Sequence, residues 1–258
     1  MPIEQHAVAS SIPGIPGRSI RVWTPPGYRD DAAPLPALYL HDGQNVFAPG
    51  GPFGCWHAER SADHAVRSGI LPPFLIVAID NDGANRRREY VPPGHQYRDT
   101  AEGVADRYGT FVTGDVMPFV RDRYRVTDDP ARTAIAGSSL GGVISLYMGF
   151  TTGLFGAVGS FSTAICWAPR FAANLAGQPH RPTRIYHDIG GREAVNMAPD
   201  NYWEVNHALH RSLQALGYRE PHALTFVVDP DGEHNEAAWA RRFPFFLNWL
   251  WSPKESAS

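Results

Sequence analysis

The most reactive pattern in this sequence is G-x-S-x-G at residues 137–141, where a short apolar run leads directly into a helix-like segment. Ser139 at its centre is a candidate nucleophile, because a serine hydroxyl reacts well only when a tight strand-to-helix turn presents it beside a base and backbone N–H donors. Gly137 and Gly141 leave room for such a turn. The pattern also fits an ordinary glycine- and serine-rich turn, so the hypothesis depends on a suitable acid and histidine further along the chain.

Two acids and one histidine after Ser139 stand in the required order. Asp188 and Glu193 both follow a short apolar run that ends at residue 186. His234 lies in a glycine-containing loop between the last expected strand and the last expected helix. The order serine, acid, histidine is that of an α/β-hydrolase, in which histidine takes the serine proton and the carboxylate orients the imidazole. The residues alone leave the choice between Asp188 and Glu193 open.

Apolar runs alternate with longer amphipathic segments, which is typical of a mostly parallel sheet covered by helices on both faces. We expect a partly exposed antiparallel strand at 18–23 and buried strands at 38–40, 74–79, 133–136, 157–161, 185–186 and 224–228. We expect helices at 61–68, 110–124, 140–150, 202–216 and 236–251, kinked or restarted at Pro118 and Pro244. The predicted fold class is α/β, as one α/β-hydrolase domain over residues 1–258 with about seven or eight strands.

Two loops are longer than a simple connection requires, at residues 42–56 and 80–102. Each follows the carboxyl end of an expected parallel strand. Ligands of open α/β sheets bind at that edge, and long loops in compact domains are commonly functional. We therefore expect the substrate site to lie between these loops and Ser139.

Composition excludes several other classes of protein. The net charge of −3 and a single short basic cluster at 86–88 argue against a nucleic-acid or membrane partner. Cys55 and Cys166 are far apart in sequence and suggest neither a disulfide framework nor a metal site. The amino terminus lacks the charge and apolar stretch of a secretory signal, so a cytoplasmic protein is expected. Its oligomeric state is not indicated.

Several segments in register resemble the esterase family of α/β-hydrolases. This family includes enterochelin esterases, feruloyl and acetylxylan esterases, S-formylglutathione hydrolases and mycolyltransferases. The matching segments run through nearly the whole chain, at residues 38–47, 88–92, 118–125, 136–142 and 232–239. The first contains His-Asp-Gly-Gln-Asn, which is most similar to a poorly characterised, enterochelin esterase-like branch.

The resemblance implies a role for each of the candidate residues. Ser139 matches the family nucleophile and His234 its base. The family acid lies three residues after a glycine at the end of a strand, which selects Glu193 over Asp188, although aspartate is commoner there. The oxyanion donors would be the backbone N–H groups of Leu140, which follows the nucleophile, and of Gln44. This chemistry needs no metal or cofactor.

The expected function is hydrolysis of a small or aryl carboxylic ester through an acyl-enzyme, the substrate being a siderophore, a feruloyl or acetyl sugar ester, or similar. Aromatic residues near the strand ends could contact an aryl group: Phe47, Trp56, Trp167 and Trp203. Arg87 could meet an anionic substrate. An acyltransferase would use the same three residues with a different acceptor. A binding protein without catalysis is the less favoured alternative, because both Ser139 and His234 are present.

Overall fold

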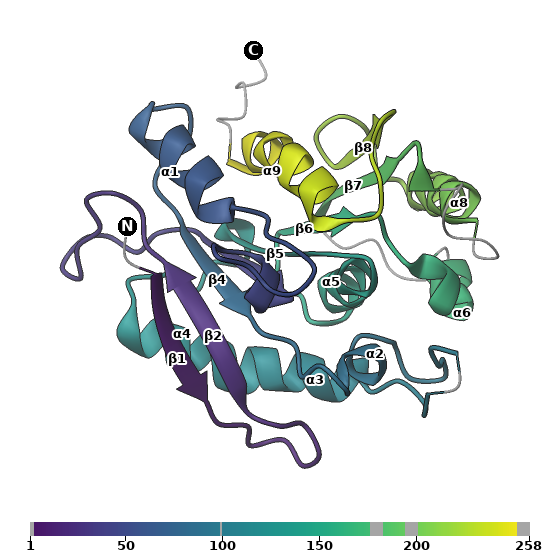
Figure 1. The fold of residues 1–258 in the computed structure, drawn as a ribbon, viewed down its shortest axis with the longest axis horizontal. Coiled ribbons are helices and arrows are strands. Elements are labelled where there is room, and N and C mark those ends of the chain that lie inside the picture. Colours follow the sequence, from purple (N-terminus) through teal and green to yellow (C-terminus); the bar gives the residue numbers. More distant parts are fainter. Residues whose placement is uncertain (1–2, 99, 176–182, 194–200, 252–258) are drawn as a thin grey trace.

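The computed structural model describes residues 3–98, 100–175, 183–193 and 201–251. Across these ranges the chain forms an eight-stranded sheet with the strand order β1-β2-β4-β3-β5-β6-β7-β8 (Figure 1). Its strands are β1 (Ile3–Val8), β2 (Arg18–Trp23), β3 (Ala37–His41), β4 (Leu75–Ile79), β5 (Thr133–Ser138), β6 (Ala157–Phe161), β7 (Arg184–Gly190) and β8 (Leu224–Asp229). β2 pairs antiparallel with β1 and β4. The neighbouring strands in the rest of the sheet, β4-β3-β5-β6-β7-β8, all pair in parallel. The predicted α/β fold class is confirmed.

Helices cover both faces of the sheet. Those that the structure describes are α1 (Ala58–Arg67), α2 (Arg86–Glu89), α3 (Ala105–Phe111), α4 (Met117–Arg123), α5 (Leu140–Thr151), α6 (Pro169–Asn174), α8 (Tyr202–Ala215) and α9 (Glu236–Trp251). α1 and α9 pack on one face, while α3, α4, α5 and α8 pack on the other. The central strands β3, β4, β5 and β6 are buried along their whole length, because both of their faces carry small or apolar side chains.

The helix expected at 110–124 is divided. α3 ends at Phe111, a π-helical segment follows at Val112–Val116, and α4 begins at Met117 with Pro118 in its first turn. Proline has no backbone N–H to give to the preceding turn, so the hydrogen-bond pattern changes just before it. Pro244, in contrast, lies inside the continuous helix α9.

Two differences from the expected strands have clear causes. β1 was not expected, since its sequence places polar residues on a half-exposed edge strand and shows little apolar patterning. β7 runs to Gly190 and is therefore longer than the expected 185–186. Its extra residues include His187 and Asp188, which are polar but completely buried. The longer strand places Gly190 and Glu193 at the carboxyl edge of the sheet.

The two long loops both lie at that edge. The loop after β3 begins with a 3-10 turn at Gly43–Asn45, and the loop after β4 contains α2. A partly buried ion pair between Asp42 and Arg86 joins them, with Oδ1–Nε and Oδ2–Nη2 distances of 2.6 and 2.7 Å. No helix within the described ranges is long and apolar enough to cross a membrane.

Candidate active site

Ser139 lies at a strained turn between β5 and α5. Its φ of 57° and ψ of −121° are unusual for a residue with a side chain. The turn is tight enough that a Cβ on Gly137 would lie 2.8 Å from the carbonyl of Gly141. Two hydrogen bonds hold the Ser139 backbone. Its N–H donates to the Phe161 carbonyl, and its carbonyl accepts from the Ala164 N–H. This is the tight strand-to-helix turn that the sequence motif predicts.

His234 contacts Glu193 at the carboxyl edge of the sheet. The His234 Nδ1 to Glu193 Oε2 distance is 3.0 Å, and the two residues come from the loops after β8 and β7. The Glu193 side chain is completely buried, whereas 14% of the His234 side chain is exposed. The rings of Tyr202 and Trp239 pack edge-on against the imidazole, with centroids 5.0 and 5.1 Å away. One ring nitrogen of His234 is thus occupied by a carboxylate in a fixed orientation.

Ser162, directly after β6, holds the other oxygen of Glu193. The Ser162 hydroxyl lies 2.5 Å from Glu193 Oε1. It also receives hydrogen bonds from Trp239 Nε1 at 2.8 Å and Arg242 Nη2 at 2.7 Å. Both of those groups can only donate, so the single proton of Ser162 must point to Glu193. The Glu193 carboxylate therefore accepts from Ser162 on one oxygen and is left to accept from His234 Nδ1–H on the other.

The second acid candidate, Asp188, faces away from this contact. Its carboxylate lies 3.1 Å from Arg242 Nε and accepts hydrogen bonds from the Ser162 N–H and the Tyr186 hydroxyl. Burial raises the pKa of the Asp188 carboxyl to about 7, although the Arg242 charge opposes the rise. Arg242 also lies 3.8 Å from Glu193. One buried guanidinium is therefore shared between the two acid candidates, and only Glu193 reaches His234.

The two expected oxyanion donors lie at helix starts. Leu140 is the first residue of α5, and Gln44 lies in the 3-10 turn after β3, so neither N–H has an acceptor in a preceding turn. The Gln44 side chain accepts a hydrogen bond from the Asn81 N–H at 3.1 Å. Asp42 begins this turn with a φ of 58°.

The Asp42 carboxylate is bound by side chains from the loop after β4. Arg86 pairs with both of its oxygens, and Asn81 Nδ2 donates to it at 2.6 Å. Burial would raise the pKa of Asp42, but the Arg86 charge and these hydrogen bonds together hold it below its ordinary value. A Cβ on Gly141 would lie 3.2 Å from Asp42 Oδ2, so this carboxylate packs directly against the start of α5.

A cleft of about 480 Å³ contains both Ser139 and His234. Its lining residues are Asp42, Gln44, Asn45, Pro52, Phe53, Asn81, Gly83, Arg86, Arg87, Ser138, Ser139, His234, Glu236 and Trp239. Gln44 and Arg87 thus lie where the sequence places them. Phe53, which is 77% exposed, is an aromatic wall residue that sequence reasoning missed.

The four expected aromatic contacts lie outside this lining. Phe47 and Trp56 are buried in the core, where Trp56 packs against Phe161, Trp239 and Phe243. Trp167 and Trp203 line two other hollows of the surface. A position near a strand end does not determine on which side of the loop a large apolar side chain points.

Sequence reasoning also missed Ser162, Arg242 and Arg86. Ser162 and Arg86 follow expected strands at the carboxyl edge of the sheet, and this position could have identified them. Arg242 lies more than one turn inside α9, where the sequence gives no such indication. Neither Cys55 nor Cys166 forms a disulfide. Within the described ranges, no three His, Cys, Asp or Glu side chains are grouped so that they could hold a metal ion.

Comparison with known proteins identifies a family that covers most of this chain. A family model described as "Putative esterase" matches residues 17–250. An uncharacterised protein of Bacillus subtilis, YbbA, is 25% identical over 93% of this chain and 94% of its own length.

The iron(III) enterobactin esterase of Dickeya dadantii is 27% identical over 89% of this chain, but the match spans only 51% of that protein. The enterobactin esterase of Shigella flexneri, solved in the presence of enterobactin, has a TM-score of 0.76 at 24% identity, over 98% of this chain and 60% of the other. The chain thus spans about half the length of the Dickeya dadantii esterase and 60% of the Shigella flexneri esterase. The chain belongs to the esterase family that the family model describes, which consists of carboxylic ester hydrolases with the α/β-hydrolase fold.

Proposed function

We propose that this protein hydrolyses carboxylic esters through an acyl-enzyme on Ser139, with His234 as the base and Glu193 as the acid. The observation that carries the proposal is the 3.0 Å contact between His234 Nδ1 and Glu193 Oε2, at the cleft that also contains the strained Ser139. Because Glu193 is completely buried and Ser162 fixes its orientation, the imidazole can only rest with its proton on Nδ1. Its Nε2 is then free to accept the Ser139 proton.

The proposed reaction has two steps. Ser139 Oγ attacks the ester carbonyl while His234 Nε2 takes the hydroxyl proton, and the negative oxygen accepts hydrogen bonds from the N–H groups of Leu140 and Gln44. The intermediate collapses as His234 returns the proton to the leaving alcohol. A water then repeats the sequence on the acyl-enzyme, with His234 again as the base. Throughout, the Glu193 carboxylate stabilises the imidazolium.

The proposed substrate is a small or aryl ester, and an ester of a siderophore is the leading example. The cleft of about 480 Å³ offers the exposed ring of Phe53 and the exposed guanidinium of Arg87 beside Ser139. These groups suit a planar acyl or alcohol part with negative charge. The relatives named as enterobactin esterases support this class of substrate.

A covalent inhibitor tests the nucleophile directly. Phenylmethylsulfonyl fluoride should inactivate the protein and add one sulfonyl group to the peptide that contains Ser139, as peptide mass spectrometry would detect. The neighbouring Ser138 provides the matched control, since it is buried at the end of β5. Ser138→Ala should still be labelled and Ser139→Ala should not. A label on Ser138, or none on either residue, would contradict the proposal.

Ser162 is expected to position Glu193. Ser162→Ala removes a hydrogen bond to a carboxylate, a contact worth about 1.5–3 kcal/mol, so we expect kcat for p-nitrophenyl acetate to fall about tenfold or more with little change in KM. Ser160→Ala is the matched control, because Ser160 is equally buried but its hydroxyl contacts Thr163 instead. Thermal melts of both variants separate a loss of folding from a loss of orientation. Equal losses of kcat in the two variants would remove Ser162 from the mechanism.

A further inference from the structure

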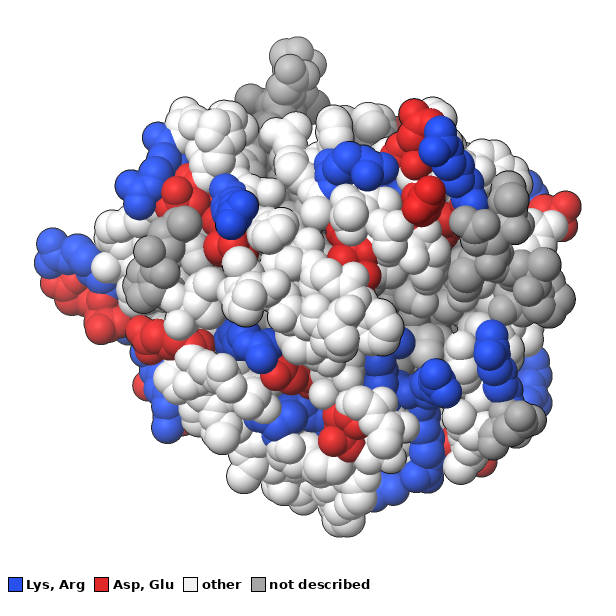
Figure 2. All heavy atoms as spheres, in the orientation of Figure 1, with Lys and Arg blue, Asp and Glu red and all other residues white. Residues whose placement is uncertain are grey.

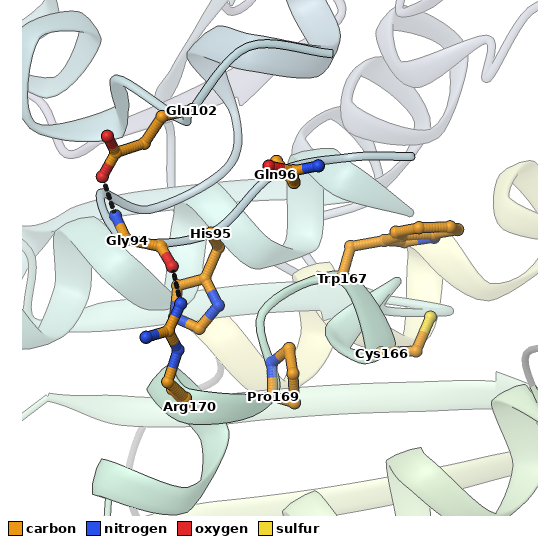
Figure 3. A pocket seen from close by; sticks show the side chains of 8 residues that line it. All are labelled: Gly94, His95, Gln96, Glu102, Cys166, Trp167, Pro169 and Arg170. Atoms are coloured by element: carbon orange, nitrogen blue, oxygen red, sulfur yellow. Dashed lines mark hydrogen bonds between the residues drawn. The ribbon is translucent and has the colours of Figure 1, made fainter. Parts of the chain in front are cut away.

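A second hollow, of about 600 Å³, lies between the loop after β4 and the start of α6. Figure 3 shows the side chains of His95, Trp167, Pro169 and Arg170 around it. Its full lining consists of Gly94, His95, Gln96, Glu102, Cys166, Trp167, Pro169 and Arg170. Glu102 is the one acid in this lining, and its carboxylate already accepts a hydrogen bond from the Gly94 N–H at 2.6 Å.

Trp167, which lines the hollow, belongs to a stack of aromatic rings and arginines that continues outside the lining. The rings of Trp167 and Tyr97 pack with centroids 4.4 Å apart. The Arg98 guanidinium lies over both rings, at 5.6 Å from Trp167 and 5.4 Å from Tyr97. Arg170 donates to the Gly94 carbonyl at the other side of the hollow. Basic side chains gather on the face over α2 and α6 (Figure 2).

The stack connects this hollow to the cleft of Ser139. Arg87 lines that cleft, and its guanidinium lies 5.3 Å over the Tyr97 ring. A second connection runs through the backbone, since the Ala164 N–H bonds to the Ser139 carbonyl and the Trp167 N–H bonds to the Ala164 carbonyl. A ligand that reaches from Ser139 past Arg87 would therefore meet Tyr97, Trp167 and Arg98 in turn.

We propose that this hollow binds a planar ring with a negatively charged substituent, carried by the part of the ester that lies farthest from Ser139. The inference rests on the proposed esterase function and extends it to a second substrate subsite. Trp167 supplies a flat apolar surface for the ring. Arg170 in the lining, and Arg98 next to the lining over Trp167, supply positive charge for its substituent. The hollow thus selects long, anionic aryl esters over short ones.

Three esters of graded length and charge test this subsite: p-nitrophenyl acetate, the ethyl ester of N-benzoylglycine, and the same ester with a para-carboxylate on its ring. The native protein should have its lowest KM for the carboxylated ester. Trp167→Ala should raise KM for both benzoyl esters about tenfold relative to the acetate. Arg98→Gln should raise KM for the carboxylated ester more than for the neutral benzoyl ester.

Trp249→Ala provides the matched control. Trp249 is also half-buried beneath an arginine, with the Arg184 guanidinium 4.7 Å from its ring, but it lies at the opposite edge of the sheet. This variant should preserve the native preference among the three esters. If Trp167→Ala changes KM equally for all three esters, or changes KM for none of them, the proposed subsite is contradicted.

A binding measurement separates this inference from the esterase function. N-(para-carboxybenzoyl)glycine, titrated into Ser139→Ala, should quench tryptophan fluorescence, and adding Trp167→Ala to that variant should weaken binding about tenfold. If the native protein cleaves no ester while this binding difference persists, the esterase function fails and the subsite holds. If esters are cleaved but the binding difference is absent, only the subsite fails.

Discussion

Ser139→Ala is expected to lower kcat for p-nitrophenyl acetate by about 10⁴-fold or more, with the protein still folded. The alanine side chain occupies the same turn but has no hydroxyl, so no acyl-enzyme can form. Steady-state kinetics with careful background subtraction measures the loss. Retained turnover would contradict the assignment of Ser139.

The strain at this residue supplies an independent check of its geometry. Ser139→Gly should be as inactive as Ser139→Ala but should unfold at a higher temperature, because glycine adopts a φ of 57° and ψ of −121° without the cost that a Cβ imposes. A lower melting temperature for the glycine variant would mean that the turn is not strained as described.

Glu193→Gln is expected to lower kcat about 10³- to 10⁴-fold, whereas Asp188→Asn should lower it less than about tenfold. Of the two acids, only Glu193 contacts His234. Glutamine at this position has no charge to stabilise the imidazolium, and its amide can either donate to or accept from His234 Nδ1, so it no longer fixes the position of the ring proton. Asp188→Asn leaves that contact in place and weakens the pairing with Arg242.

The comparison of these two variants needs a stability measurement, since Arg242 is buried and loses its nearest charged partner in Asp188→Asn. Thermal melts and circular dichroism show whether either protein is unfolded at the assay temperature. A larger loss of kcat in folded Asp188→Asn than in Glu193→Gln would reverse the choice of acid.

Sequence reasoning succeeded for features that depend on backbone shape. The turn itself requires the glycines around Ser139, so the motif predicts the tight change from strand to helix. The buried strands were recognisable because β3, β4, β5 and β6 are apolar or small on both faces. β1 was missed for the opposite reason, since an edge strand with exposed polar residues has no comparable pattern.

Sequence reasoning could not place side chains whose direction depends on packing. Trp56 and Trp167 both follow strands, but one is packed among the aromatic residues of α9 and the other borders a surface hollow. The choice between Asp188 and Glu193 could not be made from the residues alone, because it depends on three distant residues: Ser162, Trp239 and Arg242 form the network that orients Glu193.

The ion pair between Asp42 and Arg86 has a consequence for attempts to change substrate preference by loop exchange. Arg86 belongs to the loop that carries Arg87 and Tyr97, while Asp42 begins the turn that carries Gln44. Grafting a foreign loop after β4 would leave the largely buried Asp42 carboxylate without its charged partner and would therefore destabilise this edge of the sheet. The loops after β3 and β4 should therefore be exchanged together, with both taken from the same enzyme.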